Sequence, residues 1–309
     1  MAIIEHSLHP ADRAEMEKMR AYLAQQPKLT ISPETKGIYD AFMASILPAV
    51  GVTFEQEVIG DIPGWWCKPG SAEPEAAIIH FHGGAYVVGS AEAYRPFVSH
   101  IAAGTGMAVF IPDYALAPER PFPAAFHDAG AVLDGLHRQG FRKLALTGDS
   151  AGGGLALALA QDAARNKTQE GPSIQRVVAM SPWTDLTLTA PSLASHADID
   201  PVLTCEVLAG AAELYAGASI DRRDPRLSPL FGVMSGMPPV MIHIGTDEIL
   251  FDDAVNYDTA AQRQGATIET HVWSGMTHVF PANIAMFHAA REAMNLSSAF
   301  LRSGLRSQP

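Results

Sequence analysis

A serine stands on a glycine-flanked turn between an expected strand and an expected helix. Ser150 lies within Gly148-Asp149-Ser150-Ala151-Gly152-Gly153, after the apolar stretch 143–147 and before the Leu-Ala run 155–159. Glycines suit this turn because it strains the serine backbone and brings neighbouring segments too close for a Cβ. The Gly-x-Ser-x-Gly pattern is weakly specific by itself, but with both flanks present it predicts that Ser150 is a nucleophile.

A serine hydroxyl needs a base within hydrogen-bond reach, and the base needs a carboxylate to orient it. In a strand-turn-helix hydrolase the acid follows a late strand, and the histidine lies on the loop before the last helix. His271 falls inside an expected strand and His288 on the closing helix, whereas His278 lies in the loop 275–278. His278 is therefore the predicted base.

The predicted acid is Asp247, the first carboxylate after the buried strand 240–245. Glu248, Asp252 and Asp253 compete with it. We expect Glu248 to point away from its neighbour Asp247, and we expect the two later aspartates to cap the helix that follows.

Ester hydrolysis also needs donors for the developing oxyanion. The run His80-Phe81-His82-Gly83-Gly84-Ala85 follows a strand, and the N–H groups of Gly83, Gly84 and Ala151 are the predicted donors. His80 and His82 share one face of a strand, which permits a two-histidine metal site, but no third ligand accompanies them and we expect no metal. Tyr86, beside the glycines, is the predicted substrate-binding residue.

Six short apolar runs alternate with helical segments, which predicts an α/β fold with a mostly parallel sheet covered on both faces. They are 76–81, 107–112, 143–148, 177–181, 240–245 and 268–273. With an antiparallel hairpin over 53–67, the sheet is expected to have eight strands. We expect N-terminal cap helices in 1–50, a hydrolase core in 51–183 and 236–309, and an inserted cap segment in 184–235.

The composition narrows the class of protein and its partners. The chain has 309 residues, 48% hydrophobic and 17% charged, with a net charge of −12, as in a globular protein. Without a Lys/Arg-rich block, neither nucleic acid nor a stable membrane association is expected. The N-terminal stretch lacks the features of a secretory signal, which favours a cytoplasmic location. Cys67 and Cys205 are expected to be packing residues.

The motifs together resemble the bacterial hormone-sensitive-lipase-like esterases of the α/β-hydrolase superfamily, in the subgroup with the Gly-Asp-Ser-Ala-Gly form. Besides the serine turn and the loop of His278, the resemblance rests on residues 82–86, 113–119, 224–230 and 245–248. It implies a triad of Ser150, Asp247 and His278 under a helical cap. It further implies hydrolysis of short to medium acyl esters without a cofactor, and a homodimer formed through the edge strand 268–273.

Two positions depart from the family's motifs: Ala85 stands where glycine is common, and Ala115 where arginine is usual. The bounded cap predicts acyl chains of about two to eight carbons. A lactone or amide hydrolase on the same triad is an alternative, as is a ligand-binding protein on an inactive hydrolase scaffold. The presence of His278 argues against the latter.

Overall fold

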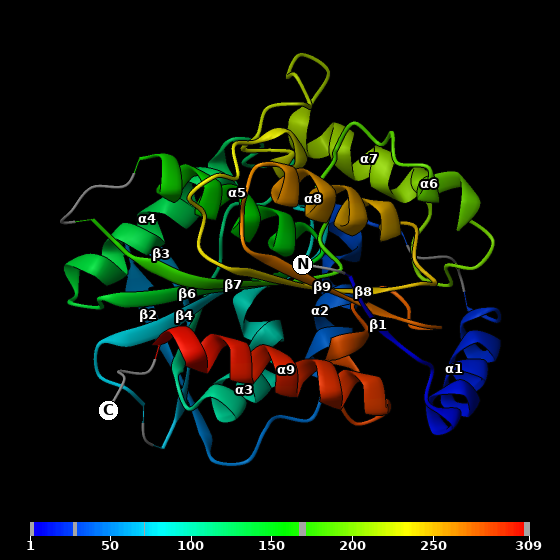
Figure 1. Ribbon diagram of the computed structural model, residues 1–309, viewed down its shortest axis with the longest axis horizontal. Helices are drawn as coiled ribbons and strands as arrows, with labels where there is room; N and C mark the ends of the chain where they lie inside the picture. Colours follow the sequence, from blue (N-terminus) through cyan, green and yellow to red (C-terminus); the bar gives the residue numbers. More distant parts are fainter. Residues whose placement is uncertain (1–2, 27–29, 71, 167–170, 306–309) are drawn as a thin grey trace.

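The described residues form a nine-stranded sheet with helices on both of its faces (Figure 1). The chain is seen in a computed structural model that describes residues 3–26, 30–70, 72–166 and 171–305. The strand order is β1-β9-β8-β7-β6-β4-β5-β3-β2. The strands are β1 (Ile4–His6), β2 (Val52–Ile59), β3 (Ile62–Pro69), β4 (Ala76–Phe81), β5 (Ala108–Pro112), β6 (Lys143–Asp149), β7 (Ile174–Met180), β8 (Val240–Gly245) and β9 (Ile268–Trp273).

The central strands are parallel, and β3 alone among the described strands runs antiparallel to both of its neighbours, β2 and β5. Strands β4, β5 and β8 are buried along their whole length, as expected of parallel strands that have helices on both sides. The predicted α/β architecture is confirmed.

The sheet has one strand more than the eight predicted. Residues Ile4–His6 form β1, which pairs in parallel with β9. The rings of His6 and His271 share a hydrogen bond of 2.8 Å across this pairing. Three residues are too few to give a periodic signal, which is why the sequence did not reveal the strand. The predicted dimer strand 268–273 is therefore not an edge strand, because β1 covers it.

Helices α4, α5 and α8 lie over one face of the sheet and α3 and α9 over the other, while α6 and α7 lie beyond α8 (Figure 1). The α-helices are α1 (Pro10–Leu23), α2 (Lys36–Ala44), α3 (Ala91–Thr105), α4 (Ala124–Arg138), α5 (Ala151–Arg165), α6 (Ser192–Ser195), α7 (Cys205–Ala216), α8 (Phe251–Arg263) and α9 (His288–Leu305). Helices α6 and α7 fall within the segment 184–235 that was predicted to be a cap. No helix within the described residues is both long and apolar enough to cross a bilayer.

The start of α5 packs closely against the end of β4. A Cβ on Gly152 would be 2.0 Å from the carbonyl oxygen of Phe81, and one on Gly148 would be 2.3 Å from the carbonyl oxygen of Gly152. Only glycine fits at such distances, so these two positions fix where β6 turns into α5.

The start of α9 is capped by a residue from α1. The buried carboxylate of Asp12 accepts hydrogen bonds from the backbone N–H groups of His288 and Ala289, at 2.7 and 2.9 Å. These N–H groups have no partner within their own helix, so Asp12 takes the role that a local N-cap residue usually has.

We predict that Asp12→Ala lowers the free energy of unfolding by about 1–2 kcal/mol, because it removes the acceptor of two N–H groups at the start of α9. Urea denaturation measures this change. Glu17→Ala, at an exposed position of the same helix, is the control and should change stability by less than about 0.5 kcal/mol. Equal losses in the two variants would contradict the capping role.

Candidate active site

The turn at Ser150 holds the serine in a strained conformation, as predicted from its glycines. Its φ and ψ are 52° and −122°, a combination that is uncommon outside glycine. The backbone is fixed on both sides: the N–H of Ser150 donates to Met180 at 2.9 Å, and its carbonyl accepts from Trp183 at 3.0 Å. The residue is only 7% exposed.

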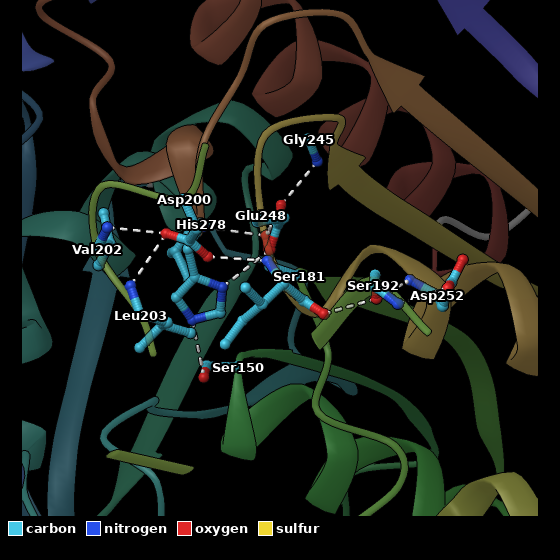
Figure 2. Close-up of polar contacts among 12 residues, drawn as sticks. Ser150, Ser181, Ser192, Asp200, Val202, Leu203, Gly245, Glu248, Asp252 and His278 are labelled. Carbon is cyan, nitrogen blue, oxygen red and sulfur yellow. Dashed lines mark hydrogen bonds and ion pairs between the residues drawn. The ribbon is translucent and has the colours of Figure 1, made fainter. Parts of the chain in front are cut away.

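The serine is joined to a histidine and a glutamate by a chain of hydrogen bonds (Figure 2). Ser150 Oγ lies 3.0 Å from His278 Nε2, and His278 Nδ1 lies 2.9 Å from Glu248 Oε2. Two of the predicted residues, Ser150 and His278, are thus brought together.

The structure places Glu248, not Asp247, against His278. Asp247 instead accepts a hydrogen bond from Arg20 of α1 at 2.6 Å and another from Thr246 Oγ1 at 2.8 Å. The prediction assumed that the first carboxylate after β8 reaches the histidine. The turn after β8 instead brings the second carboxylate, Glu248, to the histidine. Glu248 folds back so that its Oε1 accepts the N–H of Gly245 at 2.7 Å.

Glu248 is fully buried, and its carboxylate is bonded at both oxygens. Oε1 accepts from Gly245 and also from Ser181 Oγ at 2.9 Å, while Oε2 faces His278. Ser181 Oγ in turn accepts the N–H of Val279 at 3.0 Å, so this hydroxyl connects the acid to the loop that carries the histidine. Ser181, at the end of β7, was not singled out from the sequence, where nothing distinguished it from other serines.

Burial and charge act in opposite directions on the two titratable partners. Burial raises the pKa of Glu248, and its hydrogen bond to His278 opposes the rise. Burial lowers the pKa of His278, but the hydrogen bond and charge of Glu248, helped by Asp200 and Asp149, outweigh it and the pKa lies above 6.5. This histidine is therefore stabilised in its protonated form, as a base that receives a proton must be.

Of the two glycines expected in the oxyanion hole, Gly83 is already engaged. Its N–H donates to Asp149 Oδ1 and to the hydroxyl of Tyr94, both at 3.1 Å. The N–H groups of Gly84, Ala85 and Ala151 have no acceptor among the residues that the structure describes. Gly84 and Ala85 both have positive φ, 113° and 53°, so the alanine adopts the conformation for which glycine is common at this motif.

His80 and His82 make separate contacts in the interior. His80 Nδ1 lies 3.0 Å from Thr147 Oγ1, and His82 Nδ1 donates to the carbonyl of Gly83 at 2.7 Å. Burial lowers the pKa of His82 to about 4. The described part of the chain holds no group of three or more His, Cys, Asp or Glu side chains suited to a metal ion.

Tyr86, the predicted substrate-binding residue, is buried against α7. Its ring stacks on Tyr215 of α7, with centroids 3.9 Å apart and planes at 7°. The hydroxyl of Tyr215 is buried without a hydrogen-bond partner among the described residues. Tyr215 was not identified from the sequence, because the stacking joins segments far apart in the chain.

Residues 78–282 match a protein family described as the alpha/beta hydrolase fold. The chain belongs to this α/β-hydrolase family. An esterase of Acinetobacter venetianus is 36% identical to it over 70% of this chain and 71% of that protein. An acetyl-hydrolase of Streptomyces hygroscopicus is 34% identical over 79% and 81%.

A solved structure confirms the predicted resemblance to the bacterial hormone-sensitive-lipase esterases. An esterase from the bacterial hormone-sensitive lipase family superposes with a TM-score of 0.88 and 30% identity, covering 97% of this chain and 100% of that one. The chain's membership among these esterases and its class, serine hydrolase, were both predicted from the sequence.

We predict that the ring of His278 titrates above 6.5 while that of His82 titrates near 4. Histidine ring resonances followed by NMR over the accessible pH range, and assigned by single substitutions, measure both values. Glu248→Gln should move the pKa of His278 downward, because the variant removes the charge that favours the imidazolium. A His278 midpoint below 6.5 in the unaltered protein would contradict the role given to Glu248.

Proposed function

We propose that this α/β-hydrolase cleaves carboxylic esters of short to medium acyl chain through an acyl-enzyme on Ser150. The observation that carries the proposal is the hydrogen-bond chain from Ser150 through His278 to Glu248, with distances of 3.0 and 2.9 Å. Esterase and acetyl-hydrolase relatives support the same chemistry.

In the proposed mechanism, Ser150 Oγ attacks the ester carbonyl while His278 Nε2 takes its proton. Glu248 accepts from His278 Nδ1, which keeps Nε2 free to act as the base and stabilises the imidazolium. Collapse of the tetrahedral intermediate breaks the bond to the alcohol, which leaves with the proton from His278. His278 then activates a water molecule that hydrolyses the acyl-enzyme.

We propose that the oxyanion is held by the N–H groups of Gly84, Ala85 and Ala151. The N–H of Gly83 already has two acceptors, whereas these three have none among the described residues. Asp149 then has a structural role, since it orients the loop by accepting the N–H of Gly83. Such donors are each worth about 2.7–4 kcal/mol in known hydrolases.

The preference for small acyl groups is supported by the closeness of the cap. Ser150 is 7% exposed, and the stacked rings of Tyr86 and Tyr215 bring α7 against the loop that follows β4. We propose that α1, α2 and residues 184–235 form the cap, and that Tyr86 bounds the acyl site.

We predict that Ser150→Ala abolishes turnover of p-nitrophenyl esters, because among the described residues Ser150 is the one hydroxyl bonded to the ring of His278. A panel from acetate to palmitate, with a lactone added, should show turnover by the unaltered enzyme that is highest at about two to eight carbons. Wild-type rates in Ser150→Ala would refute the acyl-enzyme. Rates that keep rising toward palmitate would contradict the bounded site, and a failure to turn over any substrate would favour the ligand-binding alternative.

Two neighbouring carboxylates provide a matched test of the acid. We predict that Glu248→Gln lowers kcat/KM by roughly 10³–10⁴-fold, because the amide no longer selects the tautomer that leaves Nε2 free. Asp247→Asn removes the charge that pairs with Arg20 but keeps an oxygen acceptor, and it should lower kcat/KM by less than about fivefold. Steady-state kinetics on p-nitrophenyl acetate measure both. A larger loss in Asp247→Asn would restore Asp247 as the acid.

A further inference from the structure

The turn that carries Glu248, here called the acid loop (residues 246–252), is tied to residues 192–200. Ser192 Oγ donates to the carbonyl of Ile249 at 2.7 Å, and the N–H of Ser192 donates to Asp252 Oδ2 at 2.8 Å. Arg20 bridges the same two segments, because it donates to the carbonyl of Ile199 and to Asp247, both at 2.6 Å. The position of Glu248 therefore depends on contacts made outside the core.

The most direct of these contacts comes from Asp200, which lies beside His278 and Glu248 in Figure 2. Its Oδ1 accepts the N–H groups of Val202 and Leu203, at 2.8 and 2.9 Å. Its Oδ2 accepts the N–H of Ile249, the residue after Glu248, at 2.8 Å. The residue is 9% exposed, and no Lys or Arg in the described part of the chain forms an ion pair with its carboxylate.

We propose that Asp200 is a positioning residue for catalysis: it fixes the acid loop through Ile249 and places a negative charge facing His278. The inference rests on the proposed Ser150–His278–Glu248 mechanism. The hydrogen bonds from Val202 and Leu203 do not require a carboxylate, since the oxygen of an amide could accept both. A solvating role at the surface does not require a carboxylate either. The bond to Ile249 and the charge are what distinguish aspartate from asparagine here.

The charges that face His278 come from three elements. Glu248 lies on the acid loop, Asp149 ends β6, and Asp200 comes from the segment between α6 and α7; each of the three raises the pKa of His278. The nearby charges of Arg20 and Asp247 are paired with each other. Removal of the charge at Asp200 therefore leaves two carboxylates and lowers the pKa of His278.

Asp200→Asn tests this directly. The amide oxygen can still accept from Val202 and Leu203, but the NH2 group then faces the N–H of Ile249, and two donors cannot bond. We expect kcat on p-nitrophenyl acetate to fall by about five- to tenfold, with KM within about twofold. We also expect the acid limb of the kcat/KM profile to move to lower pH, because His278 must be neutral to accept the proton.

Asp252→Asn is the matched control, since Asp252 also joins the acid loop to the segment around Ser192 but is not among the carboxylates that face His278. The acid limb of the kcat/KM profile of Asp252→Asn should stay at the wild-type pH. Thermal melting checks that each variant is folded. Asp200→Ser, which keeps an acceptor for Val202 without a charge, is measured alongside and should show the same shift.

The outcomes separate this inference from the proposed function. An acid limb that moves to lower pH in a folded Asp200 variant and not in Asp252→Asn supports it. A wild-type acid limb and kcat in either folded Asp200 variant overturns it, provided that Ser150→Ala is inactive. If Ser150→Ala retains activity, the proposed mechanism itself fails. An equal shift in Asp252→Asn also overturns the inference, because the effect is then not specific to Asp200.

Discussion

The site depends on how tightly the turn around Ser150 is enclosed. Gly148 and Gly152 lie so close to neighbouring carbonyl oxygens that no Cβ fits, and Met180 and Trp183 bond the backbone of Ser150 on either side. Because the ends of β4, β6 and β7 meet at this point, the serine, the donors after β4 and the hydroxyl of Ser181 have fixed relative positions. The strain at Ser150 is maintained by these contacts rather than by the turn alone.

The parts of the site that depend on local sequence could be predicted. Ser150 and His278 follow from a strand-turn-helix pattern and from a loop before the last helix, both of which are visible in short stretches of chain. The parallel sheet follows from apolar runs at regular spacing.

The errors concern contacts that no short stretch encodes. Whether Asp247 or Glu248 reaches the histidine depends on how the turn folds back onto Gly245 and on Arg20 drawing Asp247 away. Gly83 was assigned to the oxyanion hole because the sequence gives no sign that Asp149 and Tyr94 accept its N–H. Strand β1 was missed because three residues carry no period.

The pairing of β1 with β9 has a consequence for how the chain folds. His6 and His271 are 265 residues apart in sequence, and closing a loop of that length is entropically costly and slow compared with local contacts. During synthesis β1 emerges first, but its partner strand emerges among the last. The first of the described strands to be made therefore completes the sheet last, and until then the edge of β9 is open to pairing with other chains.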